Sequence, residues 1–181
     1  MKKLIAIIYP NEEFPASTFE VLVQECRARG MSLAGVLQFP AFKGGDHRCD
    51  VILEDLASGH RTPLFENRGT GARGCRLDYA ALAEVVARIE GSLEAGPDLL
   101  ILNKFGKVEC DGGGFRDVIA SASNLGIPIV IGVPSRNIDW WRRFSGGLSM
   151  EISADEANVW HCLIDQLAHT DPRPTFPVGA R

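Results

Sequence analysis

Three short apolar runs constrain the fold of this chain more than any other feature of its sequence. They make up most of the expected strands Leu4–Tyr9, Leu99–Asn103 and Ile127–Val133. Strands of a parallel sheet are buried on both faces, so they read as continuous apolar runs rather than alternating ones. Between these runs the apolar residues take helical spacing, as in Phe14–Arg29, where Phe19 and Cys26 share one face. This alternation predicts an α/β fold of three layers, with helices on both faces of a mostly parallel sheet.

The remaining elements follow from similar patterns. We expect strands at Leu33–Phe39 and Leu148–Ile152, and helices at Tyr79–Leu93, Phe115–Leu125, Ile138–Phe144 and Ala154–His169. Val51–Leu56 and Thr62–Glu66 flank a glycine-containing turn and predict a small β-hairpin excursion. Because no internal repeat or linker is visible, we expect one α/β domain over residues 1–170 and a flexible, proline-rich tail over residues 171–181.

Composition argues against several classes of protein. The chain has 181 residues and a net charge of −4, whereas binding to nucleic acid or to a membrane surface favours a basic excess. The first apolar run is too short to cross a bilayer or to act as a signal sequence. Five widely spaced cysteines without a C-x-x-C pair are typical of reduced thiols. We therefore expect a cytoplasmic protein whose attraction to anions is local, and we leave a homo-oligomer open.

The segment after the first expected strand is where many α/β proteins hold a phosphate. A P-loop reads G-x-x-x-x-G-K-[ST]. In that register this chain has Pro10 and Pro15 at the glycines, Ala16 at the lysine and Ser17 at the hydroxyl residue. Proline has no N–H to donate and cannot take a positive φ, and alanine lacks the ammonium that would meet the phosphates. A working P-loop is therefore absent, and ordinary ATP hydrolysis is not expected.

A second candidate element is rich in glycine and arginine. Arg68, Arg73 and Arg76 are interleaved with Gly69, Gly71 and Gly74. Guanidinium groups offer planar forks suited to oxyanions, and glycines let the backbone approach a ligand closely. A solvated loop is the alternative, but Cys75 and the expected helix cap Asp78 favour an ordered segment. We select Arg73 and Arg76 as candidate anion contacts.

The strand Leu99–Asn103 runs directly into a basic loop. In nucleotide hydrolases such a strand usually ends in acids that hold Mg²⁺ and aim a water. Here Asn103 and Lys104 follow the apolar run, and Lys107 comes soon after. Because strand carboxyl ends in open α/β sheets face the ligand crevice, this loop should attract anions and repel metal cations. We expect Lys104 and Lys107 to contact an anion and Asn103 to orient it.

A glycine run precedes the next expected helix and supports the same site. Oriented N–H groups and the positive end of a helix dipole favour anions. The backbone of Gly112, Gly113 and Gly114, with Arg116 in the first helical turn, is therefore expected to assist binding. A plain polar connection with glycines for turns is the alternative.

Metal binding and covalent chemistry have weaker support. His47, Cys49 and His60 lack the spacing of a tetrahedral zinc site. Glu109 and Asp111 are alternative metal ligands, which the two nearby lysines oppose. No serine, histidine and aspartate arrangement resembles a nucleophile elbow. We therefore expect no metal, no cofactor other than a bound oxyanion, and no catalytic residue.

Several segments in this order resemble a bacterial family called domain of unknown function 2478. They are Arg48–Leu56, Gly71–Asp78, Leu102–Glu109, Gly114–Arg116 and Gly146–Gly147. The resemblance covers nearly the whole chain, and its most specific parts are Cys-Arg-Leu-Asp and Asn-Lys-Phe-Gly-Lys. Members of that family are commonly found beside molybdenum-transport or nitrogenase genes. The resemblance therefore implies a role around molybdate or the molybdenum cofactor, without defining a reaction.

A more distant similarity runs to the thermophilic nucleoside-triphosphatase family of P-loop proteins. Its Walker B strand continues as Asp-Glu-Ile-Gly-Lys-Met-Glu. Asn103 and Lys104 stand in place of its two acids, while Gly106, Lys107 and Glu109 match. The similarity implies a P-loop-NTPase-like fold with degenerate Walker motifs, and these departures argue against the family's hydrolase activity.

One function hypothesis and two rivals result. We expect a non-catalytic protein that binds a small oxyanion or anionic metabolite, with molybdate as the ligand suggested by the resemblance. The first rival is a nucleotide-binding phosphohydrolase with a nonstandard site, in which Lys104 takes the lysine role. The second is a regulatory protein-interaction subunit that uses the hairpin and the Trp140-Trp141 pair, of which one ring is expected in the core and one at the surface.

Overall fold

The computed structural model describes residues 3–10, 13–40, 51–65 and 76–154, and the structural statements below concern those ranges. Within them the chain forms a seven-stranded sheet of order β4-β3-β2-β5-β6-β1-β7. The strands are β1 (Leu4–Tyr9), β2 (Leu33–Pro40), β3 (Val51–Asp55), β4 (Arg61–Pro63), β5 (Leu99–Leu102), β6 (Ile129–Pro134) and β7 (Ser149–Ser153). β2, β5, β6, β1 and β7 run parallel to one another, and β3 and β4 are antiparallel to their neighbours. This confirms the predicted mostly parallel α/β sheet.

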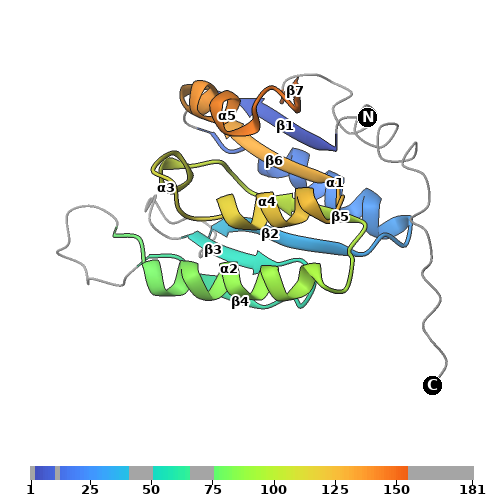
Figure 1. Cartoon of the computed structure of the whole chain (residues 1–181). Coiled ribbons are helices and arrows are strands. Elements are labelled where there is room, and N and C mark those ends of the chain that lie inside the picture. Colours follow the sequence, from blue (N-terminus) through green and yellow to red (C-terminus); the bar gives the residue numbers. More distant parts are fainter. Residues whose placement is uncertain (1–2, 11–12, 41–50, 66–75, 155–181) are drawn as a thin grey trace.

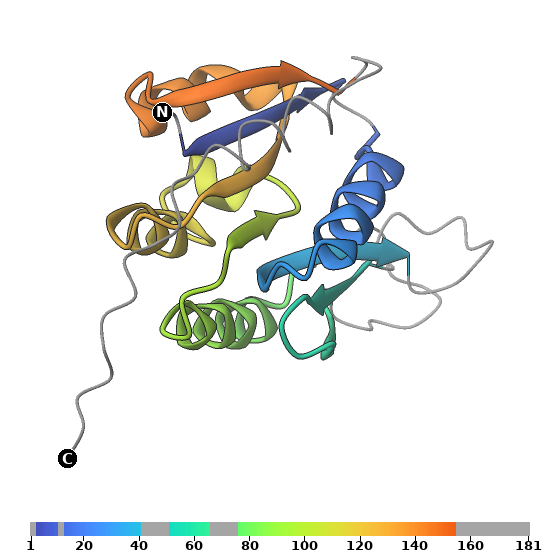
Figure 2. The same ribbon diagram turned by 90° about the vertical axis from the view of Figure 1, so that its right-hand side faces the viewer.

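Helices cover both faces of the sheet, as predicted (Figures 1 and 2). They are α1 (Ala16–Ala28), α2 (Tyr79–Leu93), α3 (Lys107–Cys110), α4 (Arg116–Asn124) and α5 (Ile138–Ser145), with a 3₁₀ turn, η1 (Ser135–Asn137), before α5. One apolar core lies between the sheet and α2, α4 and α5, and a second lies between the sheet and α1. Leu100 and Leu102 of β5 enter the first core, and Leu99 and Ile101 enter the second. Every residue of β5 is therefore buried, which is why this strand reads as a continuous apolar run.

Two predicted details of the helices are confirmed. The side chain of Asp78 caps α2, because its Oδ1 accepts the backbone N–H of Ala81 at 2.9 Å. Trp141 of α5 is fully buried, whereas Trp140 is 51% exposed. The buried indole N–H of Trp141 donates to the Ser149 hydroxyl at 3.0 Å, which ties α5 to β7.

The predicted hairpin is present, but it continues the main sheet instead of standing apart from it. β3 pairs with β2 from Val36↔Asp55 to Pro40↔Val51. Asp55 is 2% exposed, and its Oδ1 accepts the backbone N–H groups of Ala57 and Ser58 at the turn. The buried carboxylate thus shapes the turn and keeps β3 and β4 in line with the sheet.

Some predicted elements fall outside the described residues. These are most of the helix Ala154–His169 and the tail at residues 171–181. Among the helices that the structure does describe, none is both long and apolar enough to cross a bilayer.

Candidate functional site

The loops that follow β5 and β6 meet at the carboxyl edge of the sheet. β5 and β6 are parallel neighbours, paired from Leu100↔Ile129 to Leu102↔Ile131. Lys104 lies two residues after the end of β5, and Arg136 lies two residues after the end of β6. α3, which follows β5, and α5, which follows β6, both lie toward the left side of Figure 1. This is the edge at which open α/β sheets hold ligands.

The loop after β5 is held in one shape by its Phe105. The backbone N–H of Phe105 donates to the carbonyl of Gly132 in β6 at 2.7 Å, and its carbonyl accepts the Asn137 side-chain amide at 2.8 Å. The fully buried ring packs against Trp141 and Phe144, with centroids 5.3 and 5.6 Å away. Lys104 is therefore presented by an ordered backbone, and η1 is tied to the same loop through Asn137.

Glu109 closes the loop that leads from β5 to α4. It is 4% exposed, its Oε2 accepts the backbone N–H of Gly106 at 2.8 Å, and its Oε1 accepts that of Phe115 at 3.1 Å. Burial raises the pKa of this carboxyl, while the hydrogen bonds and the charge of Lys104 oppose that rise. Both oxygens accept a backbone donor and the side chain is buried, which argues against the alternative that Glu109 is a metal ligand. The sequence analysis missed this role, which the spacing of Gly106 and Glu109 as helix start and third helical residue could have indicated.

Two backbone N–H groups of the glycine run are engaged within this closure. The backbone N–H groups of Gly112 and Gly113 donate to the carbonyls of Glu109 and Val108 at 3.2 and 3.0 Å. The expectation that these two N–H groups assist a ligand is therefore corrected, because they are already engaged within the loop. Gly114 has φ +61°, and a Cβ there would lie 1.9 Å from Oε1 of Glu109.

Arg116 stands at the first position of α4, as predicted, and it is bound to its own loop. Its Nη1 donates to the carbonyl of Glu109 at 3.4 Å, and its guanidinium carbon lies 4.6 Å from the centroid of the Phe144 ring. This half-buried cation stacks on an aromatic face beside the loops after β5 and β6.

Lys104 is the half-buried cation of the site. Its Cε lies 3.6 Å from the place that a Cβ on Gly106 would take, and Oε2 of Glu109 lies 3.3 Å from the same point. Burial lowers the pKa of the Lys104 ammonium, Glu109 opposes this, and Arg136 lowers it further. Lys107, by contrast, is exposed at the first position of α3.

Arg136 is a site residue that the sequence analysis missed. Its positive charge lowers the pKa of Lys104. Burial raises the pKa of Tyr9 and of Cys110, and the charge of Arg136 opposes that rise. Arg136 therefore acts electrostatically on Lys104 from the loop after β6. A signal was present: Ser135 and Arg136 follow a buried strand in the way that Asn103 and Lys104 do.

Asn103, the residue directly after β5, is hydrogen-bonded to β2. It is 2% exposed, and its Nδ2 donates to Oε1 of Gln38 at 3.0 Å. Within the part of the chain that the structure describes, its Oδ1 is buried and has no hydrogen-bond partner. A buried acceptor of this kind is uncommon in folded proteins and is often found where a site binds something.

Aromatic rings from β1, from α1 and from Phe14 between them pack against one another. Phe14 lies edge-on to Tyr9 at 5.8 Å and stacks on Phe19 at 5.0 Å. A Cβ on Gly132 would come within 3.2 Å of the Tyr9 ring and 3.4 Å of the Phe14 ring. The backbone N–H of Ala16 donates to the carbonyl of Phe14 at 2.8 Å, so it points back into its own segment. Asn11 and Glu12 lie outside the described residues.

The arginines before α2 are placed only in part. Arg76 is exposed and immediately precedes Leu77, which bridges to Phe65. α2 begins toward the left side of Figure 1, on the same side as α3. Arg73 lies outside the described residues, and so does Cys75. The structure therefore joins the loops that carry Lys104 and Arg136, through the hydrogen bond between Asn137 and Phe105. The joining of the two predicted basic loops stays a prediction.

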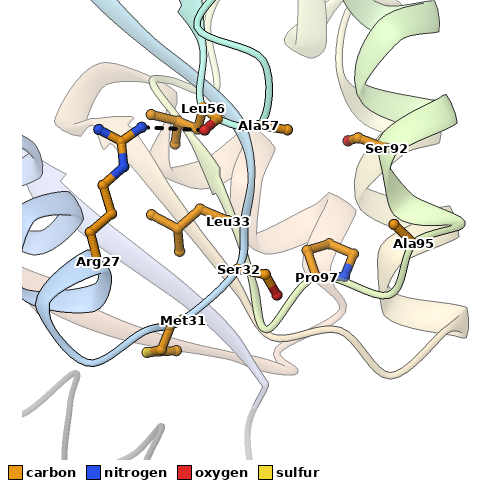
Figure 3. A pocket seen from close by; sticks show the side chains of 9 residues that line it. All are labelled: Arg27, Met31, Ser32, Leu33, Leu56, Ala57, Ser92, Ala95 and Pro97. Carbon is orange, nitrogen blue, oxygen red and sulfur yellow. Dashed lines mark hydrogen bonds between the residues drawn. The ribbon is translucent and has the colours of Figure 1, made fainter.

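A cavity of about 330 Å³ lies at the other end of the sheet (Figure 3). It is lined by Arg27, Met31, Ser32, Leu33, Leu56, Ala57, Ser92, Ala95 and Pro97. Nη2 of Arg27 donates to the carbonyl of Leu56 at 3.3 Å, and Ser32 is hydrogen-bonded to Asp98. None of the predicted site residues lines this cavity.

Among the described residues, no three histidine, cysteine, aspartate or glutamate side chains gather around a common point. His60 is exposed, whereas His47 and Cys49 lie outside the described ranges. Cys26 and Cys110 are free thiols.

The fold is that of P-loop nucleoside triphosphatases. The solution structure of a human cancer-related nucleoside triphosphatase matches 91% of this chain and 95% of its own chain, with a TM-score of 0.63 at 16% identity. The crystal structure of THEP1 from the hyperthermophile Aquifex aeolicus matches 91% and 96%, with a TM-score of 0.60 at 16% identity. These likenesses are of fold.

The chain belongs to the family described as Protein of unknown function (DUF2478), which matches residues 4–161. A curated relative, the molybdenum import ATP-binding protein ModC 2 of Bradyrhizobium diazoefficiens, is 29% identical over 150 residues. That match covers 83% of this chain but 17% of the relative, so the chain spans a small part of that protein.

Proposed function

We propose that this protein binds a small oxyanion or anionic metabolite at the carboxyl edge of its sheet, without hydrolysing it. One observation carries the proposal: Lys104 and Arg136 stand on the loops after two adjacent parallel strands, and a hydrogen bond from Asn137 to Phe105 joins these loops. Two cations held within reach of each other repel, and an anion between them relieves that repulsion. Glu109, the carboxylate whose charge acts on Lys104, already accepts two backbone N–H groups.

Further basic side chains complete the proposed site. Lys107 and Arg116 flank the same loop. We propose that Asn103 orients the ligand and that Arg73 and Arg76 contribute further charge. Hydrogen bonds to charged groups contribute about 1.5–3 kcal/mol each. Four such contacts, after the costs of association, are compatible with micromolar affinity, which corresponds to about −8 kcal/mol.

The absence of hydrolysis is supported by the residues at the two sites that a phosphate-cleaving enzyme needs. Asn103 and Lys104 follow β5, where acids would hold Mg²⁺. Pro15 precedes α1, and the Ala16 N–H is engaged with the carbonyl of Phe14. We infer that both Walker motifs are degenerate.

Molybdate is the first ligand to test. The relative that shares 29% identity is named a molybdenum import protein, and the family resemblance implies molybdenum-related genes nearby. Tungstate, sulfate and phosphate have similar tetrahedral geometry and complete the set of oxyanions.

Nucleotide binding is the second candidate function. It is favoured by the fold and by the name of the same relative, an ATP-binding protein. In this case Lys104 would meet the phosphates, and Mg²⁺-dependent phosphate release would depend on it.

Isothermal titration calorimetry with the four oxyanions, ATP and ADP tests both candidates. We expect at least one oxyanion to bind and Lys104→Ala to weaken it about tenfold or more, as loss of a charge-assisted contact predicts. Arg29→Gln removes a positive charge at the carboxyl end of α1 and serves as the matched control. No binding of any oxyanion by folded protein would refute the proposal, and Mg²⁺-dependent phosphate release would favour the second candidate.

A further inference from the structure

The cavity of about 330 Å³ in Figure 3 lies away from the carboxyl edge of the sheet and takes no part in the proposed oxyanion site. Its lining comes from the ends of α1 and α2, from the residues that lead into β2 and β5, and from the turn after β3. Small-ligand pockets in proteins have volumes of about 300–1,000 Å³. The cavity is therefore large enough for a small molecule.

The walls of the cavity are largely apolar, and its two serines are already hydrogen-bonded. The hydroxyl of Ser32 donates to the Asp98 carboxylate at 2.7 Å, and that of Ser92 donates to the carbonyl of Ile89 at 2.7 Å. The apolar part of the lining is Met31, Leu33, Leu56, Ala57, Ala95 and Pro97. The part of a ligand that fills the cavity should be apolar, because a polar group there would lose water without gaining a partner.

The backbone of these walls is held by hydrogen bonds between neighbouring elements. The N–H of Leu56 donates to the carbonyl of Gly35 in β2 at 2.9 Å. The N–H of Asp98 donates to the carbonyl of Ser32 at 2.8 Å, and the Asp98 carboxylate accepts the Ser32 N–H at 2.8 Å. The cavity is therefore formed before a ligand arrives, which reduces the ordering that binding requires.

Arg27 is the charged side chain among the described residues that line the cavity. It reaches from α1 toward the turn after β3, where its Nη2 donates to the carbonyl of Leu56 at 3.3 Å (Figure 3). A guanidinium has five N–H donors, and this is the one hydrogen bond that Arg27 makes within the described part of the chain. The contact orients the group beside the cavity and leaves donors that suit a carboxylate.

Negative charge around the cavity determines where an anionic group can sit. The Asp98 carboxylate is bound to Ser32, and the carboxyl ends of α1 and α2 carry a partial negative charge. Arg27 lies in the last turn of α1, whereas the last turn of α2 has no basic residue. An anionic head group is therefore favoured beside Arg27, with its apolar chain directed toward Pro97.

We propose that this cavity binds a small carboxylate with an apolar chain, such as a short fatty acid. The carboxylate lies on Arg27 and the chain covers Leu33. Burial of the chain provides most of the affinity, and the guanidinium selects the charge of the head group. The inference does not rest on the proposed function, because the two sites share no residue.

Titration of the full chain with hexanoate, hexanol and hexylamine, followed by amide NMR spectra of the isotope-labelled protein, tests the proposal. The probes share one chain and differ in the charge of the head group. We expect hexanoate to shift the amide signals of Ala57, Ser92 and Ala95 in a saturable way. It should bind about fivefold more tightly than hexanol, as a charge pair at an exposed position predicts. Hexylamine should bind more weakly than hexanol, because Arg27 repels its ammonium.

Variants at the end of α1 separate the charge of the cavity from general effects of charge. Arg27→Gln is expected to reduce the affinity for hexanoate to that for hexanol. Arg29→Gln is the matched control, because this arginine binds Glu25 and does not line the cavity; it should leave both affinities unchanged. Ala57→Leu places a larger side chain at the cavity wall and should weaken hexanoate and hexanol alike.

The outcomes separate this inference from the proposed function. Equal affinity for hexanoate and hexanol, or tighter binding of hexylamine, would overturn the anionic ligand class. Hexanoate shifts that appear at Lys104 and Gly106 instead of Ala57, Ser92 and Ala95 would overturn the site, and so would the absence of saturable shifts. A sulfate titration of the same sample reports the oxyanion site, so either proposal can fail alone. The comparison of probes uses the wild-type protein and does not depend on the folding of a variant.

Discussion

Glu109 accepts the backbone N–H of Gly106, three residues before it, through a 2.8 Å hydrogen bond at a buried carboxylate. Its other oxygen accepts the N–H of Phe115 at 3.1 Å. One side chain thus shapes the loop between β5 and α4 that carries Lys104 and Lys107. Since the closure is internal, the cations of the loop remain near the carboxyl edge and the carboxylate does not face outward.

Glu109→Gln is expected to destabilise the protein. An amide keeps the size of the side chain but replaces one acceptor oxygen with an N–H₂ donor, which faces a backbone N–H and leaves it unsatisfied. The expected loss in free energy of unfolding is about 1–3 kcal/mol, measured by urea denaturation. Glu94→Gln, at the exposed carboxyl end of α2, is the control. Equal stability of the two variants would contradict the role assigned to Glu109.

Gly114→Ala should destabilise the protein more than Gly112→Ala. Both glycines have positive φ, +61° and +100°, so each alanine carries backbone strain of roughly 1–2 kcal/mol. Only at Gly114 would the new Cβ collide with Glu109, at 1.9 Å, whereas nothing lies within 4 Å at Gly112. The difference between the two variants, measured by denaturation, therefore isolates the Glu109 contact. Equal losses would show that the carboxylate moves aside without cost.

Arg136→Gln is expected to weaken binding of the oxyanion found by calorimetry about tenfold or more, as the loss of a charge-assisted contact implies. Arg143→Gln removes the same charge from the exposed face of α5, where this arginine lies 5.4 Å from the Trp140 ring centroid. It should leave affinity within about threefold, because screening reduces the effect of distant surface charges. Similar losses for both variants would indicate a general effect of charge.

Anion affinity should fall as pH rises. The fall should begin at a lower pH than it would if Lys104 had the pKa of an ordinary lysine. Only protonated Lys104 contributes a positive charge, and burial and Arg136 shift its pKa downward from the usual lysine value of 10.5. Sulfate is the suitable probe because its own charge is constant from neutral to alkaline pH. In Lys104→Arg the guanidinium stays charged, so this part of the pH dependence should disappear. A wild-type affinity that is unchanged up to the ordinary lysine range would refute the expectation.

Trp141→Ala should cost about 3–5 kcal/mol of unfolding free energy, as removal of a large buried aromatic side chain does. The ring is fully buried, contacts Phe105, and donates to Ser149. Trp140→Ala, one residue earlier and 51% exposed, should change stability by about 0.5 kcal/mol or less. Thermal and urea denaturation of the pair measure the difference, and similar losses would contradict the placement of the two rings.

The local elements of this fold could be predicted because each has a local cause. β5, Leu99–Leu102, has no polar residue because both of its faces are buried. Asp78 caps α2 through a hydrogen bond to a residue only three positions later in the chain. The Trp140-Trp141 pair had to divide between core and surface, since adjacent helical residues point in different directions. In each case the physical reason acts within a few residues of the chain.

The sheet order and the site were decided only by tertiary contacts. Arg136 follows a buried strand, as Lys104 does, but only the parallel pairing of β5 and β6 puts their two loops at neighbouring positions of the sheet edge. In sequence Glu109 is an alternative metal ligand that the nearby lysines oppose, and only the folded loop directs its oxygens to Gly106 and Phe115. The chain by itself therefore determined which segments become strands and helices, through burial and capping. Pairing of strands distant in sequence decided which charged loops become neighbours, because residues far apart in the chain interact only after the strands have paired.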